Sequence, residues 1–354
     1  MSSIPSQQKA LALLSKQGEW ALVTVDVDKP GPGEVLVRIE SSGLNPAEWK
    51  IQTLGLFDLP QYPGILGTDP AGVVVEVGEG VTSLAVGDRV VHQGNYMNRV
   101  AAFKQYTIAP AEIVAKLPDH ISFDQASTIP VASGAAWVGL YGQKQELGGA
   151  QLTPPWVEGG LGKYAGQPIM IVGGASSVGQ FVIQLAKLSG FSPIITTASP
   201  RNVELLKSLG AAHVLDRNLT QDELVKAVRQ ITSEPIKVVY DSVSYKETQN
   251  AGYEILSSGG TMVITSLLEV AHEKITEDKP IFRTFGSLHM PFNRELGLQF
   301  YRNLPEYLKT GEIKPLPTEV LPEGLAGIPK GLDRLKNGQV SALKLVARPQ
   351  ETGA

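Results

Sequence analysis

The stretch 169–179, IMIVGGASSVG, decides the fold because it joins an apolar segment to a helical pattern through a turn of small residues. The four apolar residues Ile169 to Val172 predict a short buried parallel strand. From 178 to 188 apolar residues recur at helical spacing. A strand, a small-residue turn and a helix are typical of a phosphate-binding unit, in which the helix N-terminus binds a pyrophosphate. The stretch therefore predicts a dinucleotide-binding domain.

The glycine pattern of this turn departs from the dinucleotide fingerprint. Gly174-x-Ser176-x-x-Gly179 has Ser where the fingerprint prefers its second Gly. Serine is small enough for close backbone approach and can donate its hydroxyl. A turn of this kind can also be purely structural, so the neighbouring segment has to decide between the two interpretations.

The next predicted strand, 192–197, is followed by the segment 198–202, ASPRN. An NAD site places an acidic residue here, about 20 residues after the glycine turn, to bind the ribose 2′-hydroxyl. No acidic residue lies between 194 and 202, and Ser199 and Arg201 stand there instead. A hydroxyl and a guanidinium bind a 2′-phosphate, which a carboxylate repels. We therefore expect NADPH rather than NADH; the alternative is that Arg201 is a solvated residue in the first turn of the next helix.

Composition limits the classes of function. The chain has 354 residues, enough for two domains, and its net charge of -4 indicates no nucleic-acid or anionic-membrane partner. The absence of Cys excludes disulfides, thiolate metal ligands and a Cys nucleophile. The first twenty residues have no signal pattern and no apolar run reaches membrane-spanning length, so we expect a soluble cytoplasmic protein.

The chain changes texture along its length. Residues 1–120 predict short strands with tight turns, typical of a β-barrel, whereas from 168 strands and helices alternate as in a doubly wound parallel sheet. The loop 143–166 is long enough to suggest a functional role. The pattern at 313–348 again resembles the first part. We predict one domain from 1–125 and 312–354 and a second from 126–311.

Several motifs, in this order along nearly the whole chain, resemble the medium-chain dehydrogenase/reductase superfamily. They are 32–37 (PGEVLV), 67–74 (GTDPAGVV), 77–78 (VG), 87–90 (GDRV), the turn 173–179 and 206–211 (LKSLGA). The resemblance implies a GroES-like β-barrel domain built from both termini, a central Rossmann domain and a bound nicotinamide cofactor.

The same resemblance indicates whether this chain has the ligands of a zinc site. Zinc alcohol dehydrogenases of this superfamily carry a Cys after the second strand and a His in a Gly-His-Glu motif. Here those positions hold the segments 42–45 (SGLN) and 67–69 (GTD). Zinc needs nitrogen or sulfur ligands in tetrahedral geometry, and the five histidines are scattered at 92, 120, 213, 272 and 289. We expect no metal site.

Within the superfamily the chain resembles the fungal reductases of secondary-metabolite clusters, the trans-acting enoyl reductases and their relatives. The similar segments are 44–50 (LNPAEWK), 199–202 (SPRN), 285–287 (FGS) and the block 308–344. This resemblance implies NADPH-dependent reduction of a C=C bond conjugated to a carbonyl in a small-molecule substrate. It implies that the cofactor is lined by Ala47, Trp49, Lys50, Gly174, Ser176, Ser177, Val178, Gly179, Ser199, Arg201, Asn202, Ser266, Leu267, Phe285, Lys344 and Leu345. It implies that Ser133, Trp137, Phe285, Gly286 and Ser287 face the nicotinamide and the substrate.

One position departs from that family. Relatives commonly have an aromatic residue after the Asp at 216, whereas this chain has Arg217. We count Arg217 among the cofactor-binding residues as a second cation for the 2′-phosphate; the alternative is a solvated side chain.

The catalytic candidates follow from the chemistry of conjugate reduction. Hydride goes to the β-carbon and leaves an enolate, so the protein has to hold the reacting carbons about 3–3.5 Å apart and to stabilise an oxyanion. Lys50 is the first candidate, to contact the nicotinamide ribose or to donate to the oxyanion, unless it is a surface lysine. Asn45, where the zinc branch has a ligand, and Tyr96, a possible acid, are the others; a turn residue and a packed tyrosine are the simpler interpretations.

Three other functions remain open from the sequence. A quinone reductase is the first alternative, a cofactor-binding protein without turnover the second, and a zinc alcohol dehydrogenase the third. The substrate, the proton donor and the choice between a monomer and a homodimer are not encoded in any motif.

Overall fold

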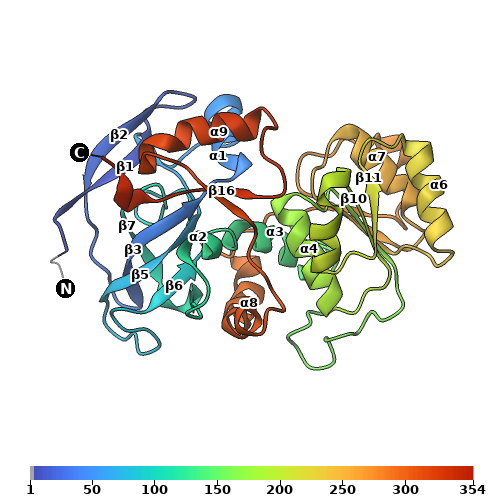
Figure 1. The fold of residues 1–354 in the computed structure, drawn as a ribbon, viewed down its shortest axis with the longest axis horizontal. Coiled ribbons are helices and arrows are strands. Elements are labelled where there is room, and N and C mark those ends of the chain that lie inside the picture. Colours follow the sequence, from blue (N-terminus) through green and yellow to red (C-terminus); the bar gives the residue numbers. More distant parts are fainter. Residues whose placement is uncertain (1–3, 354) are drawn as a thin grey trace. The chain divides into compact units, whose positions relative to one another are not determined.

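A computed structural model describes residues 4–353, which form two compact units. The first unit comprises residues up to 131, Tyr301–Lys309 and the residues from 315 onward. The second comprises Ala132–Phe300 and Thr310–Lys314 (Figure 1). The domain limits predicted from the sequence, 1–125 with 312–354 and 126–311, stay a prediction.

The second unit is built on one six-stranded parallel sheet. Its strands occur in the order β11-β10-β9-β12-β13-β14, and every neighbouring pair is parallel. This is the strand order of a Rossmann fold, so the predicted doubly wound sheet is confirmed. The strands are β9 (Ile169–Val172), β10 (Ile194–Ala198), β11 (His213–Asp216), β12 (Val238–Asp241), β13 (Thr261–Ile264) and β14 (Ile281–Arg283).

Helices alternate with these strands, and their apolar faces bury the core. Met170, Val239 and Met262 from three neighbouring strands lie in one fully buried cluster. α4 packs against α5, and α6 packs against α7. The helices are α3 (Pro130–Tyr141), α4 (Ser177–Leu188), α5 (Val203–Leu209), α6 (Gln221–Ile231) and α7 (Lys246–Ile255).

The first unit contains two sheets. The smaller has the order β2-β1-β4, from β1 (Gln7–Leu13), β2 (Trp20–Asp26) and β4 (Gly64–Ile65). The larger has the order β15-β16-β3-β5-β6-β8, with β7 paired to β3. Its strands are β3 (Glu34–Gly43), β5 (Asp69–Val77), β6 (Arg89–His92), β7 (Tyr106–Pro110), β8 (Val114–Lys116), β15 (Thr318–Val320) and β16 (Lys344–Ala347).

The C-terminal segment completes the first unit. β16 pairs antiparallel with the end of β3, with Val346 opposite Gly43 and Ala347 opposite Ser42. β15 then adds parallel to β16 at the edge of the sheet. Chain segments about three hundred residues apart in sequence therefore share one sheet.

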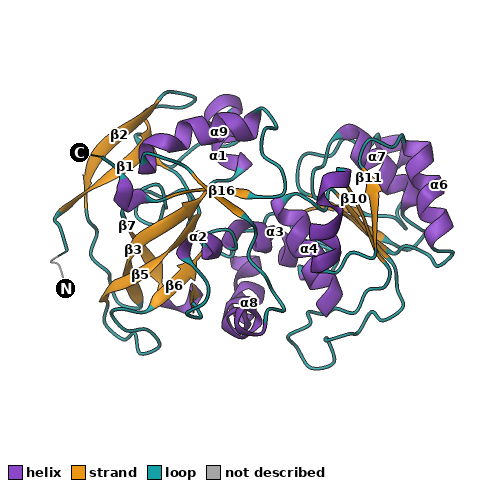
Figure 2. Cartoon of the chain, viewed as in Figure 1, coloured by secondary structure: helices purple, strands orange, loops and turns teal. Residues whose placement is uncertain are grey.

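Helices of the first unit differ most from the sequence prediction. The pattern of short strands over 1–120 missed α1 (Pro46–Leu54), which packs against α9 (Ile328–Lys336), as Figure 2 shows. Local signals do support α1: Pro46 is its first residue, and Gly55 ends it with φ of 62°. The remaining α-helices are α2 (Phe123–Ala126), in the first unit, and α8 (Pro291–Thr310), whose residues are divided between the two units.

Candidate functional site

The turn between β9 and α4 can be built only with glycine at specific positions. Gly173 has φ of +78°, and a Cβ on Gly174 would lie 2.1 Å from Oγ1 of Thr196 in β10. A Cβ on Gly179 would lie 2.4 Å from the carbonyl oxygen of Gly173. The three glycines thus bring the helix start close to the strand ends, as a dinucleotide turn requires.

Ser176 caps α4 with its side chain. Its Oγ accepts a hydrogen bond from the Gly179 N–H at 2.9 Å and donates to Oγ of Ser242 at 2.9 Å. The N–H groups of Ser177 and Val178, which begin the helix, have no acceptor one turn earlier. The hydroxyl that sequence reasoning offered to a phosphate is therefore engaged in the cap, and the backbone N–H groups are the donors left for an anion.

The end of β10 lies directly beside this turn. The Gly173 N–H donates to Oγ1 of Thr197 at 2.9 Å, and the Gly174 N–H donates to the Thr197 carbonyl at 3.0 Å. Ser199 and Arg201 follow at once. Local hydrogen bonds therefore place the predicted 2′-phosphate residues next to the predicted pyrophosphate turn.

A second arginine joins this edge of the sheet. The Arg217 N–H donates to the Ala198 carbonyl at 3.0 Å, since β11 runs parallel to β10. Arg201 and Arg217 are both exposed, and neither forms an ion pair within residues 4–353. Asp216 lies in the same ladder and accepts a hydrogen bond from the Asn218 N–H at 2.9 Å. Asn202, also predicted to bind the cofactor, is buried and is the N-cap residue of α5.

The other predicted residues of the second unit follow β13 and β14. Ser266 and Leu267 come two residues after β13, and the Leu267 side chain is 60% exposed. Phe285 is exposed after β14, and a Cβ on Gly286 would lie 2.2 Å from the backbone nitrogen of Ala135 in α3. These segments share the carboxyl edge of the sheet with the glycine turn, where Rossmann folds bind their ligands.

Ser133 and Trp137 lie in α3 and are fully buried. The Trp137 ring stacks on Phe300 with 6.1 Å between centroids, and Trp156 contacts Phe300 edge-on at 5.5 Å. The Trp137 side chain is thus buried by packing within the second unit, and its predicted contact with the substrate stays a prediction. Ser287 lies near this region, where its carbonyl accepts from Nδ2 of Asn293 at 3.1 Å.

In the first unit the predicted residues 45–50 form the start of α1. Asn45 is the N-cap, and its N–H donates to Oε2 of Glu48 at 2.6 Å. Ala47 and Trp49 are half-buried, and Trp49 packs against the core of the unit. Nζ of Lys50 lies 5.8 Å from the Trp49 ring centroid. Burial lowers the pKa of Lys50, whose ammonium has no carboxylate partner in the described chain.

A buried polar cluster surrounds the side chain of Asn45. Its Nδ2 donates to Oδ2 of Asp69 at 2.8 Å and to Oγ1 of Thr68 at 3.3 Å. Its Oδ1 accepts from Nζ of Lys344 at 2.9 Å, and the same ammonium is paired with Asp69. Burial, and next the Asp69 carboxylate, raise the pKa of Glu48 from 4.5 to about 8.

Tyr96 and Leu345 lie beside this cluster. Burial raises the pKa of Tyr96 well above its usual value, and the carboxyl groups of Glu48 and Asp69 raise it further. The Tyr96 ring packs against Phe57 at 5.2 Å. Leu345 is fully buried, and its carbonyl accepts from the Leu44 N–H at 2.9 Å.

Sequence reasoning missed part of this cluster. Glu48, Thr68 and Asp69 were not singled out as members of a site, although Asn45-x-x-Glu48 is a capping-box pattern. Thr197 and Ser242, which fix the glycine turn, were also missed. Apart from the capping-box pattern of Glu48, nothing in the local sequence marks these side chains, because their partners come from distant segments.

Comparisons with known proteins agree with both units. A family model described as "Alcohol dehydrogenase GroES-like domain" matches residues 31–119, and one described as "Zinc-binding dehydrogenase" matches residues 177–290. A protein of Aspergillus sclerotiorum named trans-enoyl reductase resD is 34% identical over 94% of this chain and 97% of its own length. This chain belongs to the medium-chain dehydrogenase/reductase family.

Other medium-chain reductases extend the comparison. A Penicillium protein named trans-enoyl reductase grgB is 29% identical, over 97% of this chain and 98% of its own. The crystal structure of the CurK enoyl reductase matches the fold with a TM-score of 0.78 at 22% identity, covering 97% of this chain and 99% of that one. The chain is thus an oxidoreductase of a family that binds a nicotinamide cofactor.

The zinc implied by the second family model does not fit this reductase. Among residues 4–353 no three His, Cys, Asp or Glu side chains come together in a way that would hold a metal ion. Asn45, Thr68 and Asp69 belong to the segments where the resemblance to zinc alcohol dehydrogenases would place the zinc ligands, and the Lys344 ammonium lies against two of them. The donor set therefore lacks the nitrogen and sulfur ligands that zinc takes in such sites.

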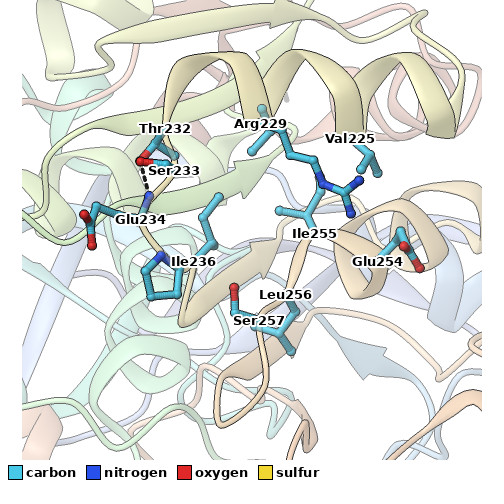
Figure 3. Close-up of a pocket in the computed structure, with 12 residues that line it drawn as sticks. Val225, Arg229, Thr232, Ser233, Glu234, Ile236, Glu254, Ile255, Leu256 and Ser257 are labelled. Carbon is cyan, nitrogen blue, oxygen red and sulfur yellow. Dashed lines mark hydrogen bonds between the residues drawn. The ribbon is translucent and has the colours of Figure 1, made fainter.

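A pocket of about 420 Å³ in this reductase lies away from the predicted cofactor edge. It is lined by the end of α6 and by residues that precede β12 and β13, among them Arg229, Thr232 and Glu254 (Figure 3). Those residues mark the amino edge of the sheet, opposite the carboxyl ends of its strands. The structure, across residues 4–353, has no helix with the length and apolar character needed to cross a membrane.

Proposed function

We propose that this chain is an NADPH-dependent reductase that adds hydride to the β-carbon of a C=C bond conjugated to a carbonyl. The proposal rests on the edge formed by the ends of β10 and β11, where Ser199 and Arg201 follow the strand beside the glycine turn and Arg217 follows the next strand of the sheet. Two guanidinium groups that form no ion pair within residues 4–353 and a hydroxyl suit a 2′-phosphate, and no acidic residue lies between 194 and 202. The choice of an enoyl acceptor is supported by relatives named trans-enoyl reductases.

The residues of the second unit would hold the cofactor. Backbone N–H groups of Ser177 and Val178 at the start of α4 suit the pyrophosphate. Ser199 and Arg201 suit the 2′-phosphate, and Ser266 with Leu267 continues the same edge of the sheet. When bound, reduced nicotinamide supplies the hydride.

The first unit would contribute Lys50 to the reaction. Its ammonium is half-buried without a counter-ion in the described chain, so an electron-rich oxygen would gain a strong donor there. We propose that Lys50 binds the nicotinamide ribose or the developing enolate oxygen. Asn45 is less suited to direct contact, because both ends of its amide are already hydrogen-bonded within the cluster.

The test is an acceptor panel with the purified chain. NADPH oxidation is measured with an enone, an enal, an enoyl thioester and a quinone, and each reaction is repeated with NADH. We expect turnover with at least one conjugated carbonyl and a preference for NADPH. Deuteride from C4-labelled NADPH should appear on the β-carbon of the product. Turnover of the quinone alone would assign a quinone reductase, and binding without turnover of any acceptor would overturn the proposed activity.

A further inference from the structure

The polar cluster in the first unit is buried to an unusual degree for charged side chains. Glu48 and Asp69 are 0% exposed, Lys344 is 2% exposed, and Asn45 and Thr68 are at most 5% exposed. They come from three separate segments: the start of α1, the residues 68–69 at the start of β5, and the start of β16. Because an unpartnered buried charge costs several kcal/mol, a cluster of this kind persists only if its charges compensate one another.

Hydrogen bonds join the Lys344 ammonium, the Asn45 amide and the Asp69 carboxylate in a closed ring. Nζ of Lys344 bonds to Asp69 and, at 2.9 Å, to Oδ1 of Asn45. Nδ2 of Asn45 completes the ring by donating to Oδ2 of Asp69 at 2.8 Å. The other carboxylate oxygen, Oδ1, accepts from the Val131 N–H at 2.7 Å. Oε1 of Glu48 has no hydrogen-bond partner in the described chain.

The atoms that converge here are those that bind cations. A carboxylate, an amide oxygen, a hydroxyl and a second carboxyl group are the oxygen ligands that hard divalent ions prefer. In this chain a covalently attached ammonium already occupies that environment. Its butyl stem enters from β16, and a Cβ on Gly43 would lie 2.9 Å from Cε of Lys344, so the stem has a built channel.

We infer that the Lys344 ammonium is the built-in cation of this cluster and that it positions Asn45 and thereby the start of α1. Lys344 is thus a positioning residue that acts through Asn45 and Asp69. The inference goes beyond the proposed reaction, because it concerns how the first unit does without a metal and can be tested without any substrate.

Removal of the ammonium should convert the cluster into a metal site. Lys344→Ala leaves the Asp69 carboxylate without a counter-ion and opens the volume of the side chain. In chelator-treated buffer we expect this variant to melt below the wild type, and Mn²⁺ or Mg²⁺ to raise its Tm by at least about 2 °C. The wild type and Lys344→Ala/Asp69→Asn should show no such rise. An unchanged Tm of Lys344→Ala with either ion, or stoichiometric zinc in the wild type after zinc dialysis, would overturn the inference.

A second set of variants covers a failure of Lys344→Ala to fold. Lys344→Met fills the channel without charge, Asp69→Asn removes the opposite charge, and the double variant removes both. If the Lys344 and Asp69 charges stabilise each other, the double variant should have a higher Tm than either single variant. Additive losses of Tm would contradict the inference.

NADPH titration separates this role from direct cofactor contact. Lys344→Met in a Lys50→Ala background should bind NADPH within about threefold of Lys50→Ala alone, because a residue that acts through the start of α1 and Lys50 adds little once the Lys50 ammonium is gone. A further loss of about tenfold or more in that double variant would indicate a direct phosphate contact by Lys344 and would overturn the positioning role. Failure of the wild type itself to bind NADPH would refute the proposed function and leave the metal and melting tests unaffected.

Discussion

In the function proposed above, single side chains determine the choice between NADPH and NADH. Arg201 and Arg217 approach one edge from different strands, and neither has an acidic partner in the described chain. A guanidinium that forms no internal ion pair is available to a phosphate from solvent. The preference for NADPH over NADH should therefore depend on these two arginines, and each can be tested by its own substitution.

Substitution of Arg201 by Ala should weaken NADPH binding selectively. Loss of a charged 2′-phosphate contact costs roughly 1.5–3 kcal/mol, or about a tenfold to hundredfold rise in the NADPH Kd. The NADH Kd should stay within about twofold. Fluorescence titration measures both constants, and Arg229→Ala, at the amino edge of the sheet, is the matched control. Equal losses for NADPH and NADH would reject Arg201 as the residue that reads the phosphate.

Lys50→Ala should lower kcat/KM about tenfold to a hundredfold, because it removes a partly desolvated charged donor. Lys50→Arg keeps the charge and should retain more activity. Steady-state kinetics with the accepted enone measures both, and Lys226→Ala in the exposed part of α6 is the control. An unchanged rate for Lys50→Ala would remove Lys50 from the site.

Glu48 should make the stability of the protein depend on pH. Its pKa is about 8 in the folded chain against an ordinary 4.5, so between these values the folded state holds a proton that the unfolded state has released. The free energy of unfolding then falls as pH rises through this window, by up to roughly 1.4 kcal/mol per pH unit. Glu48→Gln removes this loss.

Urea denaturation at several pH values measures the effect. The stability gained by Glu48→Gln should be larger at pH 8 than at pH 5, and Glu254→Gln, on the exposed side of α7, should show no such trend. A difference that stays constant across this range would show that Glu48 is ionised throughout.

Among the elements, the turn from β9 to α4 depends on close packing that only glycine, which has no Cβ, allows. Gly174→Ala places a methyl group 2.1 Å from Oγ1 of Thr196, which is itself buried and donates to the Ile171 carbonyl at 2.7 Å. We expect a loss of about 1–3 kcal/mol in the free energy of unfolding and weaker NADPH binding. Thr196→Ala in the same chain should recover part of the loss. Gly353→Ala, where a Cβ meets open space, is the control, and full stability of Gly174→Ala would contradict the geometry.

The elements also differ in how far they could be predicted from sequence. The stretch 169–188 has a continuous apolar strand and a regular helical spacing, so local sequence determines both elements. α1 has only nine residues and mixed polarity, and its helical signals are its end residues rather than a periodic pattern. The local sequence pattern therefore did not distinguish α1 from the strands that surround it in the sequence.

At the scale of the whole molecule, fold class was predictable and the polar cluster was not. The alternation of strands and helices after 168 fixes a doubly wound sheet, whose strand order the structure confirms. Asn45 and Lys344, however, are 299 residues apart in sequence and meet only because β16 returns to β3. Contacts of this range depend on the completed fold, so no local pattern reports them.

Cofactor binding should raise the stability of the whole chain. A ligand at a hundred times its Kd adds about 2.7 kcal/mol, which shifts Tm by about 2–4 °C per kcal/mol in a protein of this order of size. At equal concentrations NADPH should therefore raise Tm more than NADH does. Differential scanning fluorimetry measures this difference; a larger shift with NADH would contradict the proposed phosphate contacts.

The return of β16 to β3 also orders events on the ribosome. Every residue of the second unit has been synthesised once the chain reaches Lys314, whereas the first unit still lacks β15 and β16. The buried carboxylate of Asp69 thus has no Lys344 counter-ion until β16 has been synthesised. Newly made chains should acquire protease resistance first in the segment 132–300, although it is translated after most of the first unit.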